Sequence, residues 1–331
     1  MGNTVFKTEK EEIMMKKQVI KIMSLGALAL GLMGCGQGKE NDQKEIGIIQ
    51  YAEHQALNDS REGFLEGLAA AGLKDGEKIK VDYQNAQADQ SNLNSIAQGM
   101  KGRKDLVFTI ATPAAQAALN TDKETPTLFT AVTDPEAANL VKSNDHPGTN
   151  ASGTSDRAPV EKAVDLLLKI NPEIKTVGMP YNSSEVNSEI QFTAFKEYAE
   201  SKGLKVEAQT VTTSNEVQSA ITALAKKVDG ICLPTDNTIA QTIPTIGKVV
   251  KEEKVPTIGA ESAHIDGCLA TYGVNFKLLG RQTAGMALKI LEEDADISEM
   301  PVEKTNEFEL QVNEEMASAL GIDTEQLKKG E

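Results

Sequence analysis

The sequence contains no tryptophan, and only 4% of its 331 residues are aromatic. So few aromatic side chains disfavour a wide stacking surface for carbohydrate or for a docked partner. Cysteine and histidine are also scarce, at three residues each, and the spacing of the cysteines matches neither a disulfide framework nor a zinc site. Cys232 lies in an apolar segment and Cys268 follows a glycine. We expect two buried free thiols, with a Cys232–Cys268 disulfide as the alternative.

Positive charge is in short supply. The sequence has 34 Lys+Arg residues and 49 Asp+Glu residues, which gives a formal net charge of −15. This balance argues against a nucleic-acid partner, because phosphate binding depends largely on lysine and arginine. The sequence also has no GxSxG, P-loop or GxGxxG motif, and none of its histidines lies in a recognisable nucleophile motif. It therefore favours a protein that is not an enzyme and that binds no metal or cofactor.

The first 35 residues have the pattern of an export signal. Lys16, Lys17 and Lys21 precede an apolar stretch over 22–33, which is too short for a helix to span a hydrocarbon core of ~30 Å. Small residues before Cys35 resemble the lipobox of bacterial lipoproteins, in which the cysteine thiol takes a diacylglycerol and becomes the new N-terminus. We therefore predict a fatty-acylated (palmitate-type) Cys35. An ordinary secretory signal with a chance cysteine is the alternative.

The segments on either side of the apolar stretch fit the same interpretation. Residues 1–13 mix lysine with glutamate and look like an upstream extension, with Met14 or Met15 as the true start. Residues 36–44 are polar, which is typical of a tether. These features predict a protein held by its lipid on the extracytoplasmic face of the cell membrane.

From residue 45 onward, short apolar strands alternate with helical segments. The first unit has expected strands at 46–49, 79–83, 106–110 and 127–132, and helices at 58–71, 90–102 and 113–120. The second unit has expected strands at 176–180, 206–211, 230–233, 256–259, 269–272 and 309–312, and helices at 160–170, 184–203, 216–227, 238–253 with a kink at Pro244, 276–292 and 313–320. This alternation predicts an α/β protein with two doubly wound parallel-sheet lobes of about five strands each.

Doubly wound sheets bind ligands beyond the carboxyl ends of their strands, so polar residues there form the candidate site. Thr112 is a predicted N-cap, and the N–H of Ala114 behind it would favour a carboxylate. Ser183 or Ser184 would begin a second helix in the same way. The structural alternative is that such residues, Asp236 included, only cap their own helices. The candidate ligand-binding residues are Gln50, Tyr51, His54, Thr112, Ala114, Thr133, Asp134, Tyr181, Asn182, Ser183, Ser184, Asp236, Asn237 and Glu261.

Several segments are specific enough to indicate a family. They are IIQY at 48–51, DYQNAQ at 82–87, ATPAAQ at 111–116, FTAVTDP at 129–135, YNSSE at 181–185, PTDNT at 234–238 and ATYG at 270–273. On these segments the chain resembles the substrate-binding lipoproteins of ABC importers whose characterised members bind aromatic amino acids, tryptophan especially. The resemblance runs from the lipobox to about residue 323.

The resemblance implies a type I periplasmic-binding fold, in which three crossovers join two lobes. The crossovers would lie near 155–159, 273–276 and 300–305. The N-terminal lobe would then comprise 45–155 with 276–299, and the C-terminal lobe 156–275 with 300–331.

The resemblance also implies roles around an amino-acid ligand. The residues implied for the carboxylate are Thr112, Ala114, Thr133 and Ser183 or Ser184. Asp236 would meet the ammonium, and Asn182 and Asn237 would complete the polar frame. The residues implied to flank a ring are Tyr51, His54, Tyr181 and Tyr272. The lack of any tryptophan as a stacking partner is at odds with a tryptophan ligand, so a smaller apolar amino acid stays open.

The function implied is that of a monomeric, membrane-tethered binding protein. It would capture tryptophan, phenylalanine or tyrosine between its lobes and deliver it to an ABC permease and its ATPase. The alternatives are another small apolar amino acid or related solute, or a sensor that reports to a signalling partner. An enzyme acting on the same ligand is disfavoured by the missing nucleophile–base pair.

Overall fold

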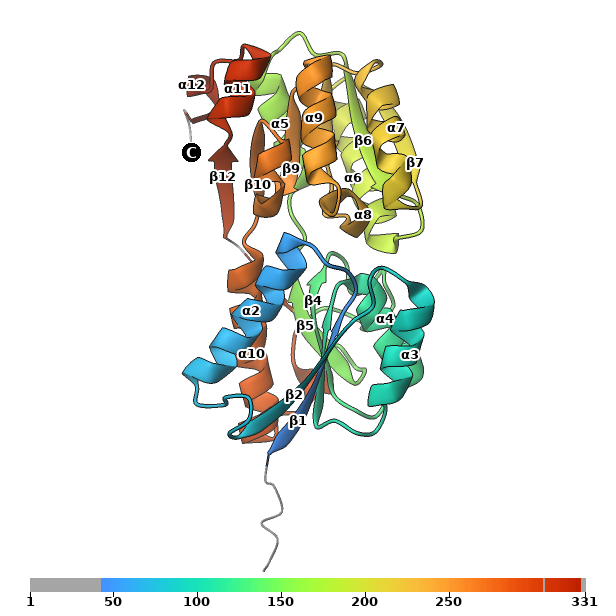
Figure 1. The fold of residues 1–331 in the computed structure, drawn as a ribbon, viewed down its shortest axis with the longest axis vertical. Helices are drawn as coiled ribbons and strands as arrows, with labels where there is room; N and C mark the ends of the chain where they lie inside the picture. Colours follow the sequence, from blue (N-terminus) through green and yellow to red (C-terminus); the bar gives the residue numbers. More distant parts are fainter. Residues whose placement is uncertain (1–42, 306, 329–331) are drawn as a thin grey trace, which may run out of the picture. The chain divides into compact units, whose positions relative to one another are not determined.

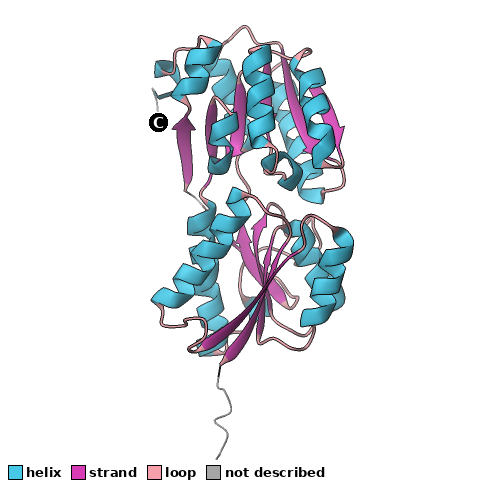
Figure 2. Ribbon diagram, viewed as in Figure 1, coloured by secondary structure: helices cyan, strands magenta, loops and turns pink. Residues whose placement is uncertain are grey.

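The structure, a computed structural model, describes residues 43–305 and 307–328. Within them the chain forms two α/β lobes, each built on a six-stranded, largely parallel sheet with helices on its faces (Figures 1 and 2). The predicted fold class is therefore confirmed. The first sheet has two strands beyond the four expected ranges, and the second sheet has the six that were expected. None of the helices in this described part combines the length and apolar character needed to span a bilayer.

The first lobe is built on a wholly parallel sheet with the strand order β11-β5-β4-β3-β1-β2. Its strands are β1 (Lys44–Gln50), β2 (Ile79–Asn85), β3 (Leu106–Ile110), β4 (Thr127–Val132), β5 (Ala151–Ser155) and β11 (Glu303–Lys304). Its helices are α2 (Gln55–Ala70), α3 (Gln90–Met100), α4 (Thr112–Thr121), α10 (Phe276–Glu293) and the 3₁₀ turn η2 (Ile297–Glu299).

The second lobe repeats the plan with the strand order β12-β10-β9-β8-β6-β7, in which β12 is antiparallel to β10. Its strands are β6 (Thr176–Asn182), β7 (Lys205–Val211), β8 (Gly230–Leu233), β9 (Thr257–Glu261), β10 (Ala270–Val274) and β12 (Phe308–Val312). Its helices are α5 (Val160–Ile170), α6 (Val186–Ser201), α7 (Ser214–Ala225), α8 (Asn237–Ala240), α9 (Ile243–Glu253), η1 (Ser262–Gly267), α11 (Glu314–Leu320) and α12 (Glu325–Lys328).

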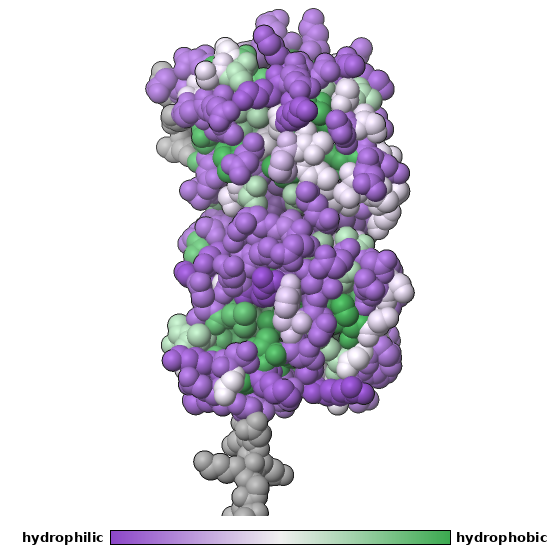
Figure 3. All heavy atoms as spheres, in the orientation of Figure 1, coloured by the Kyte–Doolittle hydropathy of each residue, from purple (hydrophilic) through white to green (hydrophobic). Residues whose placement is uncertain are grey.

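The central strands are buried along their whole length, as parallel strands covered on both faces must be. In the first lobe the ring of Phe64 on α2 stacks on Phe108 of β3, with centroids 3.9 Å apart. In the second lobe the core includes Cys232 and Cys268, which are buried and free, so the alternative disulfide does not form. Burial raises the pKa of both thiols. Hydrophilic side chains cover most of the face shown in Figure 3.

Two glycines let α2 and α10 cross at close range. A Cβ at Gly63 would lie 2.0 Å from the carbonyl oxygen of Lys277, and one at Gly280 would lie 2.1 Å from that of Ser60. Only glycine fits at such a contact, because a larger residue would push the two helix backbones apart. The crossing attaches α10 to the first lobe, although α10 follows the second lobe's strand β10 in the sequence (Figure 1).

The structure differs from the sequence prediction at three places. Strand β5 was not predicted, because its residues (ASGTS) are small or hydroxylated and show no apolar run. The helix predicted at 238–253 is two helices, α8 and α9, with Pro244 in the first turn of the second. Strand β11 pairs with β5, so residues 303–304 belong to the first sheet rather than to the C-terminal lobe. The chain therefore makes its third passage between lobes after Lys304.

Candidate functional site

The carboxyl ends of strands from both sheets converge on one small cavity. From the first lobe it is lined by His54, Ala56, Leu57, Ala131, Thr133, Asp156 and Phe276. From the second lobe it is lined by Asn187, Thr235, Asp236, Asn237 and Glu261. Its free space is about 20 Å³, roughly the room for one water molecule.

Two hydrogen bonds cross this cavity from lobe to lobe. Nε2 of His54 lies 3.2 Å from Oδ1 of Asn237. The hydroxyls of Thr133 and Thr235 lie 3.3 Å apart. These four polar side chains therefore sit where a ligand between the lobes would touch both walls.

The described residues that line the cavity include three carboxylates and no lysine or arginine. Asp156, Asp236 and Glu261 are only 3%, 1% and 2% exposed. Burial disfavours the charged form of a carboxyl group. It raises the pKa of Asp156 to about 7 and also raises the pKa of Asp236. Burial acts upward at Glu261 too, but the neighbouring His264 and His54 outweigh it, and the pKa of Glu261 is lowered.

The carboxylate of Asp236 is bonded to the backbone of its own lobe. Its Oδ1 accepts the N–H groups of Thr238 and Ile239, each at 2.9 Å, which caps α8. Its Oδ2 accepts the N–H of Asn182 at 2.6 Å, which ties the end of β6 to the start of α8. Asp236 therefore lines the cavity and also caps its own helix, which was the alternative role expected from the sequence.

A second buried acid, Glu185, lies behind Asp236. Its oxygens accept from Nδ2 of Asn182 at 3.3 Å, from Nδ2 of Asn237 at 2.5 Å and from the hydroxyl of Thr238 at 3.4 Å. Burial and the nearby Asp236 raise the pKa of Glu185 to about 8. The acids and amides of the second lobe thus form one hydrogen-bonded network.

Glu261 faces a histidine on one side and the cavity on the other. Nε2 of the fully buried His264 lies 2.6 Å from Oε1 of Glu261. Its other oxygen, Oε2, has no partner. One carboxylate oxygen is therefore held and the other is free.

Four of the lining residues carry buried polar atoms that have no hydrogen-bond partner in the structure. They are Nδ1 of His54, Oδ1 of Asp156, Oδ1 of Asn187 and Oε2 of Glu261. Because buried polar atoms are normally bonded, such a group of unpaired atoms around one cavity indicates a place for a polar ligand.

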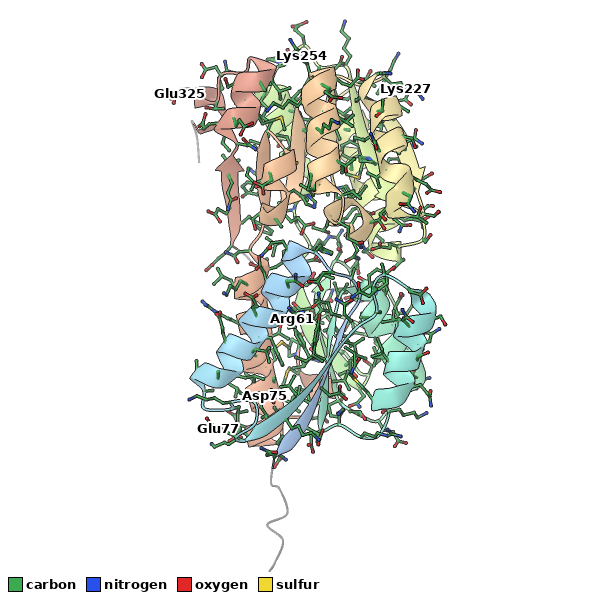
Figure 4. The ribbon with its side chains drawn as sticks, in the orientation of Figure 1. Arg61, Asp75, Glu77, Lys227, Lys254 and Glu325 are labelled. Atoms are coloured by element: carbon green, nitrogen blue, oxygen red, sulfur yellow. The ribbon has the colours of Figure 1, made fainter. Side chains whose placement is uncertain are left out.

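Several predicted site residues lie elsewhere. Gln50 is buried in the first lobe, where its Nε2 donates to Oδ1 of Asn58 at 2.8 Å and its Oε1 accepts from Arg61 (Figure 4) at 2.6 Å. Asp134 accepts the N–H of Ala137 at 3.0 Å and pairs with the half-exposed Arg157 at 2.9 Å.

Of the predicted tyrosines, two stack on phenylalanines and one lies close to the acids beside the cavity. Tyr181 stacks on Phe192 and Tyr272 on Phe308, with centroids 4.8 and 5.9 Å apart. Tyr51 is half-buried, and its pKa is raised to about 12 by burial and by the charges of Glu185 and Asp236. The negative charges of the acids beside the cavity therefore disfavour ionisation of the Tyr51 hydroxyl.

The two predicted helix starts differ from expectation. Thr112 is the first helical residue, and the N-cap is Ala111, with φ of 86°. The N–H of Ala114 donates to the carbonyl of Ala111 at 3.1 Å, so it is not free for a carboxylate. The hydroxyl of Thr112 is buried without a partner, but Thr112 does not line this cavity.

Ser183 and Ser184 are exposed and do not cap α6. Asn182 makes the turn instead, because its Oδ1 accepts the N–H of Ser184 at 2.8 Å, and the helix begins only after Glu185.

Sequence reasoning missed Asp156, Asn187 and Thr235 at the cavity, and Glu185 behind it. Asp156 directly follows β5, the strand without an apolar run. Thr235 stands one position before the predicted Asp236, and the bonds that its hydroxyl makes to Thr133 and to Oε1 of Gln191 distinguish it. Asn187 lies inside the first turn of α6, where a polar residue carries no signal of its own.

Comparison with known proteins places the chain among binding proteins. Residues 45–329 match the family model described as ABC transporter substrate binding protein. One relative, named tyrosine-binding protein, from Clostridioides difficile (strain R20291), is 38% identical over 321 residues, which cover 92% of this chain and 93% of the relative.

Two solved structures differ in how well they superpose. The ABC domain in complex with L-Trp from Streptococcus pneumonia is 36% identical, with a TM-score of 0.82 over 87% of this chain and 98% of that one. A ligand-free, open substrate-binding protein with adhesive properties from Clostridium difficile is 47% identical, with a TM-score of 0.67 over 85% of this chain and 95% of that one. The better superposition thus goes with the L-Trp complex, although its sequence is the less similar.

Proposed function

The chain belongs to the family of ABC transporter substrate-binding proteins, and we propose that it captures a free aromatic amino acid in the cavity between its lobes. The observation that carries the proposal is the set of unpaired, buried polar atoms that both lobes direct at this cavity. A ligand with several donors and acceptors would complete their hydrogen bonds when the lobes close on it.

The chemistry of the cavity suits a free amino acid. Its carboxylates offer partners for an ammonium group, which would be costly to bury alone. To donate to a ligand carboxylate, the hydroxyls of Thr133 and Thr235 would have to turn away from their present acceptors, which are Asp156 and Oε1 of Gln191. A carboxylate held this way needs no arginine, because well-placed neutral donors also stabilise a buried anion.

An aromatic side chain is supported by two further observations. Leu57 and Phe276 give the cavity an apolar part, with Ala56 and Ala131 beside them. One relative is named tyrosine-binding protein, and a similar solved structure is a complex with L-Trp. A smaller apolar amino acid is the alternative outcome of the binding test.

Capture requires the lobes to move. A free space of about 20 Å³ cannot hold an amino acid, so the lobes must stand further apart than in this structure both to admit the ligand and to hold it. The chain superposes better on the L-Trp complex than on the open relative, which supports a hinge between open and closed arrangements.

We further propose that the protein works outside the cytoplasm as a lipid-anchored monomer. Cys35, which lies outside the described residues, would carry the anchor. The closed protein would then deliver its ligand to an ABC permease and its ATPase without changing it chemically. A signalling partner would be the alternative receiver.

Calorimetry on the purified protein with the common amino acids tests the ligand. We expect L-tyrosine, L-tryptophan or L-phenylalanine to bind and to raise the melting temperature, because a ligand that binds only the folded state stabilises it by mass action. Small-angle scattering should show a smaller radius of gyration with saturating ligand. Binding of an aliphatic amino acid alone would contradict the aromatic assignment, and unchanged scattering would remove the hinge.

Replacing Cys35 tests the anchor. Cys35→Ala should move the protein from the membrane fraction to the soluble fraction, because a polar tether offers no other hydrophobic attachment. Cys232→Ala, which alters a buried thiol in the second lobe, is the control and should still pellet with membranes. A Cys35 variant that stays with membranes in high salt would exclude lipidation there.

A further inference from the structure

The three carboxylates that line the cavity are not equally available to a ligand. Asp236 already accepts three backbone N–H groups. Glu261 uses one oxygen for His264 and has the other free. Asp156 receives a hydrogen bond from the hydroxyl of Thr133, and its Oδ1 has no partner. The two unpaired carboxylate oxygens of the cavity therefore belong to Asp156 and Glu261.

These two residues are fixed to different lobes. Asp156 directly follows β5, and its N–H donates to the carbonyl of Val132 at 3.3 Å, which holds it to the first sheet. Glu261 is the last residue of β9 in the second sheet. Their charges are close enough for Glu261 to influence Asp156.

On these grounds we infer that Asp156, together with Glu261 from the opposite lobe, binds the ammonium group of the ligand. The inference rests on the proposed function and replaces Asp236 as the ammonium partner. An ammonium group has three donors and can bridge both oxygens, whereas an analogue without the amino group would leave them unpaired. The same contact would join the two lobes, so Asp156 selects for an α-amino group and favours closure.

The electrostatics of the cavity give this inference a second readout. The titratable groups that line the cavity with Asp156 are Glu261, His54 and Asp236. His264 contacts Glu261, and Glu185 lies close enough to Asp236 to feel its charge. Without ligand, burial keeps Asp156 protonated up to about pH 7. An ammonium group nearby favours the carboxylate form, so ligand binding at pH 6 should release a proton from Asp156.

The test compares two ligands and two proteins by calorimetry. The ligands are L-tyrosine and 3-(4-hydroxyphenyl)propionate, which lacks the amino group. Asp156→Asn should weaken L-tyrosine binding ~30-fold or more, the lower end for losing one partner of a buried charge pair. It should change binding of the deaminated analogue by only about threefold or less. Titrations at pH 6 in buffers of different ionisation enthalpy should show less proton release for the variant.

Two controls separate a binding defect from a folding defect. Asp156→Asn keeps the shape and removes a carboxyl group that is costly to ionise when buried, so its melting temperature without ligand should equal or exceed that of the wild type. Glu207→Gln, on the edge strand β7, should bind both ligands as the wild type does.

The outcomes distinguish this inference from the proposed function. If the wild type binds no aromatic amino acid, the proposed function is wrong and the inference falls with it. If the wild type binds L-tyrosine and Asp156→Asn weakens both ligands equally, or neither, Asp156 does not bind the ammonium group and only the inference is overturned.

Discussion

The two walls of the cavity are built differently. On the second-lobe wall, Asp236 and Glu185 accept hydrogen bonds from the backbone and from neighbouring amides, so most of its polar atoms are used within the lobe. Unpaired buried atoms occur on both walls: Oδ1 of Asn187 and Oε2 of Glu261 on the second, and Nδ1 of His54 and Oδ1 of Asp156 on the first. The walls differ at their aspartates, because Asp236 accepts three backbone N–H groups and Asp156 has an unpaired Oδ1. A carboxylate that lines such a cavity can therefore either stabilise its own lobe or be available to a ligand. Its hydrogen-bond partners show which of the two roles it has.

The sharpest test of this contrast is to remove the carboxylate of Asp236. Asp236→Ala takes the cap from α8 and leaves the buried N–H of Asn182 without an acceptor. We expect the free energy of unfolding to fall by about 3 kcal/mol, since a buried unpaired donor adds to the cost of a lost cap. Urea unfolding measures the loss.

The matched control for Asp236 is an exposed cap. Asp89 accepts the N–H of Asn92 at the start of α3 and is exposed. Asp89→Ala should cost only ~1 kcal/mol, the ordinary value of an N-cap. Equal losses at the two positions would show that Asp236 is no more than a surface-type cap, and the contrast between the walls would weaken.

The first-lobe wall depends on helix packing more than on hydrogen bonds. His54 directly precedes α2, and α2 is held against α10 by the contact of Gly63 with the backbone of Lys277. Gly63→Ala should lower the free energy of unfolding by about 2 kcal/mol, because the new methyl group forces the helices apart. Thermal and urea unfolding both measure this change.

Gly285 is the matched control on α10, because a Cβ there would meet nothing within 4 Å. Gly285→Ala should stabilise the protein by roughly 0.5–1 kcal/mol, the gain in helix propensity. Destabilisation by both substitutions would mean that the close approach at Gly63 is not the cause.

The last expected effect concerns pH and the second-lobe network. The folded pKa of Glu185 is about 8, against an ordinary 4.5, because of burial and then Asp236. Below pH 4.5 both folded and unfolded states hold the proton. As pH rises toward 8 only the unfolded state gives it up, so the free energy of unfolding falls through this window.

Glu185→Gln removes this titration while keeping the shape. Between pH 5 and pH 8 the wild type should lose stability relative to the variant, in the direction that linkage requires. Urea midpoints at pH 5, 6.5 and 8 measure the slope. Glu189→Gln, at an exposed position on α6, should leave the slope as it is, and an unchanged slope in Glu185→Gln would contradict the raised pKa.

The sequence predicted the parallel lobes and much of the second-lobe wall, because apolar strands with polar ends are visible in the residue pattern. Asp236 and Asn237 were found this way, and the structure puts both at the cavity. Asp156 was missed because its strand, β5, is buried without being apolar and is recognised only by its pairing with β4 and β11.

Hydrogen-bond partners were the other feature beyond reach of the sequence. Ser184 has the residue type of a helix cap, but Asn182 takes its N–H and delays the helix. Likewise, no sequence pattern shows that the oxygens of Asp236 accept backbone N–H groups, whereas one oxygen of Asp156 has no hydrogen-bond partner. Such differences depend on which atoms come into contact in the folded chain, so they cannot be predicted from the type and spacing of residues alone.

The position of α10 also sets the order in which the chain can be completed during synthesis. The first lobe needs α10 and β11, but these segments emerge from the ribosome only after most of the second lobe. Until then α2 lacks α10, the helix that it meets at Gly63 and Gly280. The nascent first lobe therefore stays incomplete until most of the second lobe has been synthesised, so the two lobes cannot be completed one after the other along the chain.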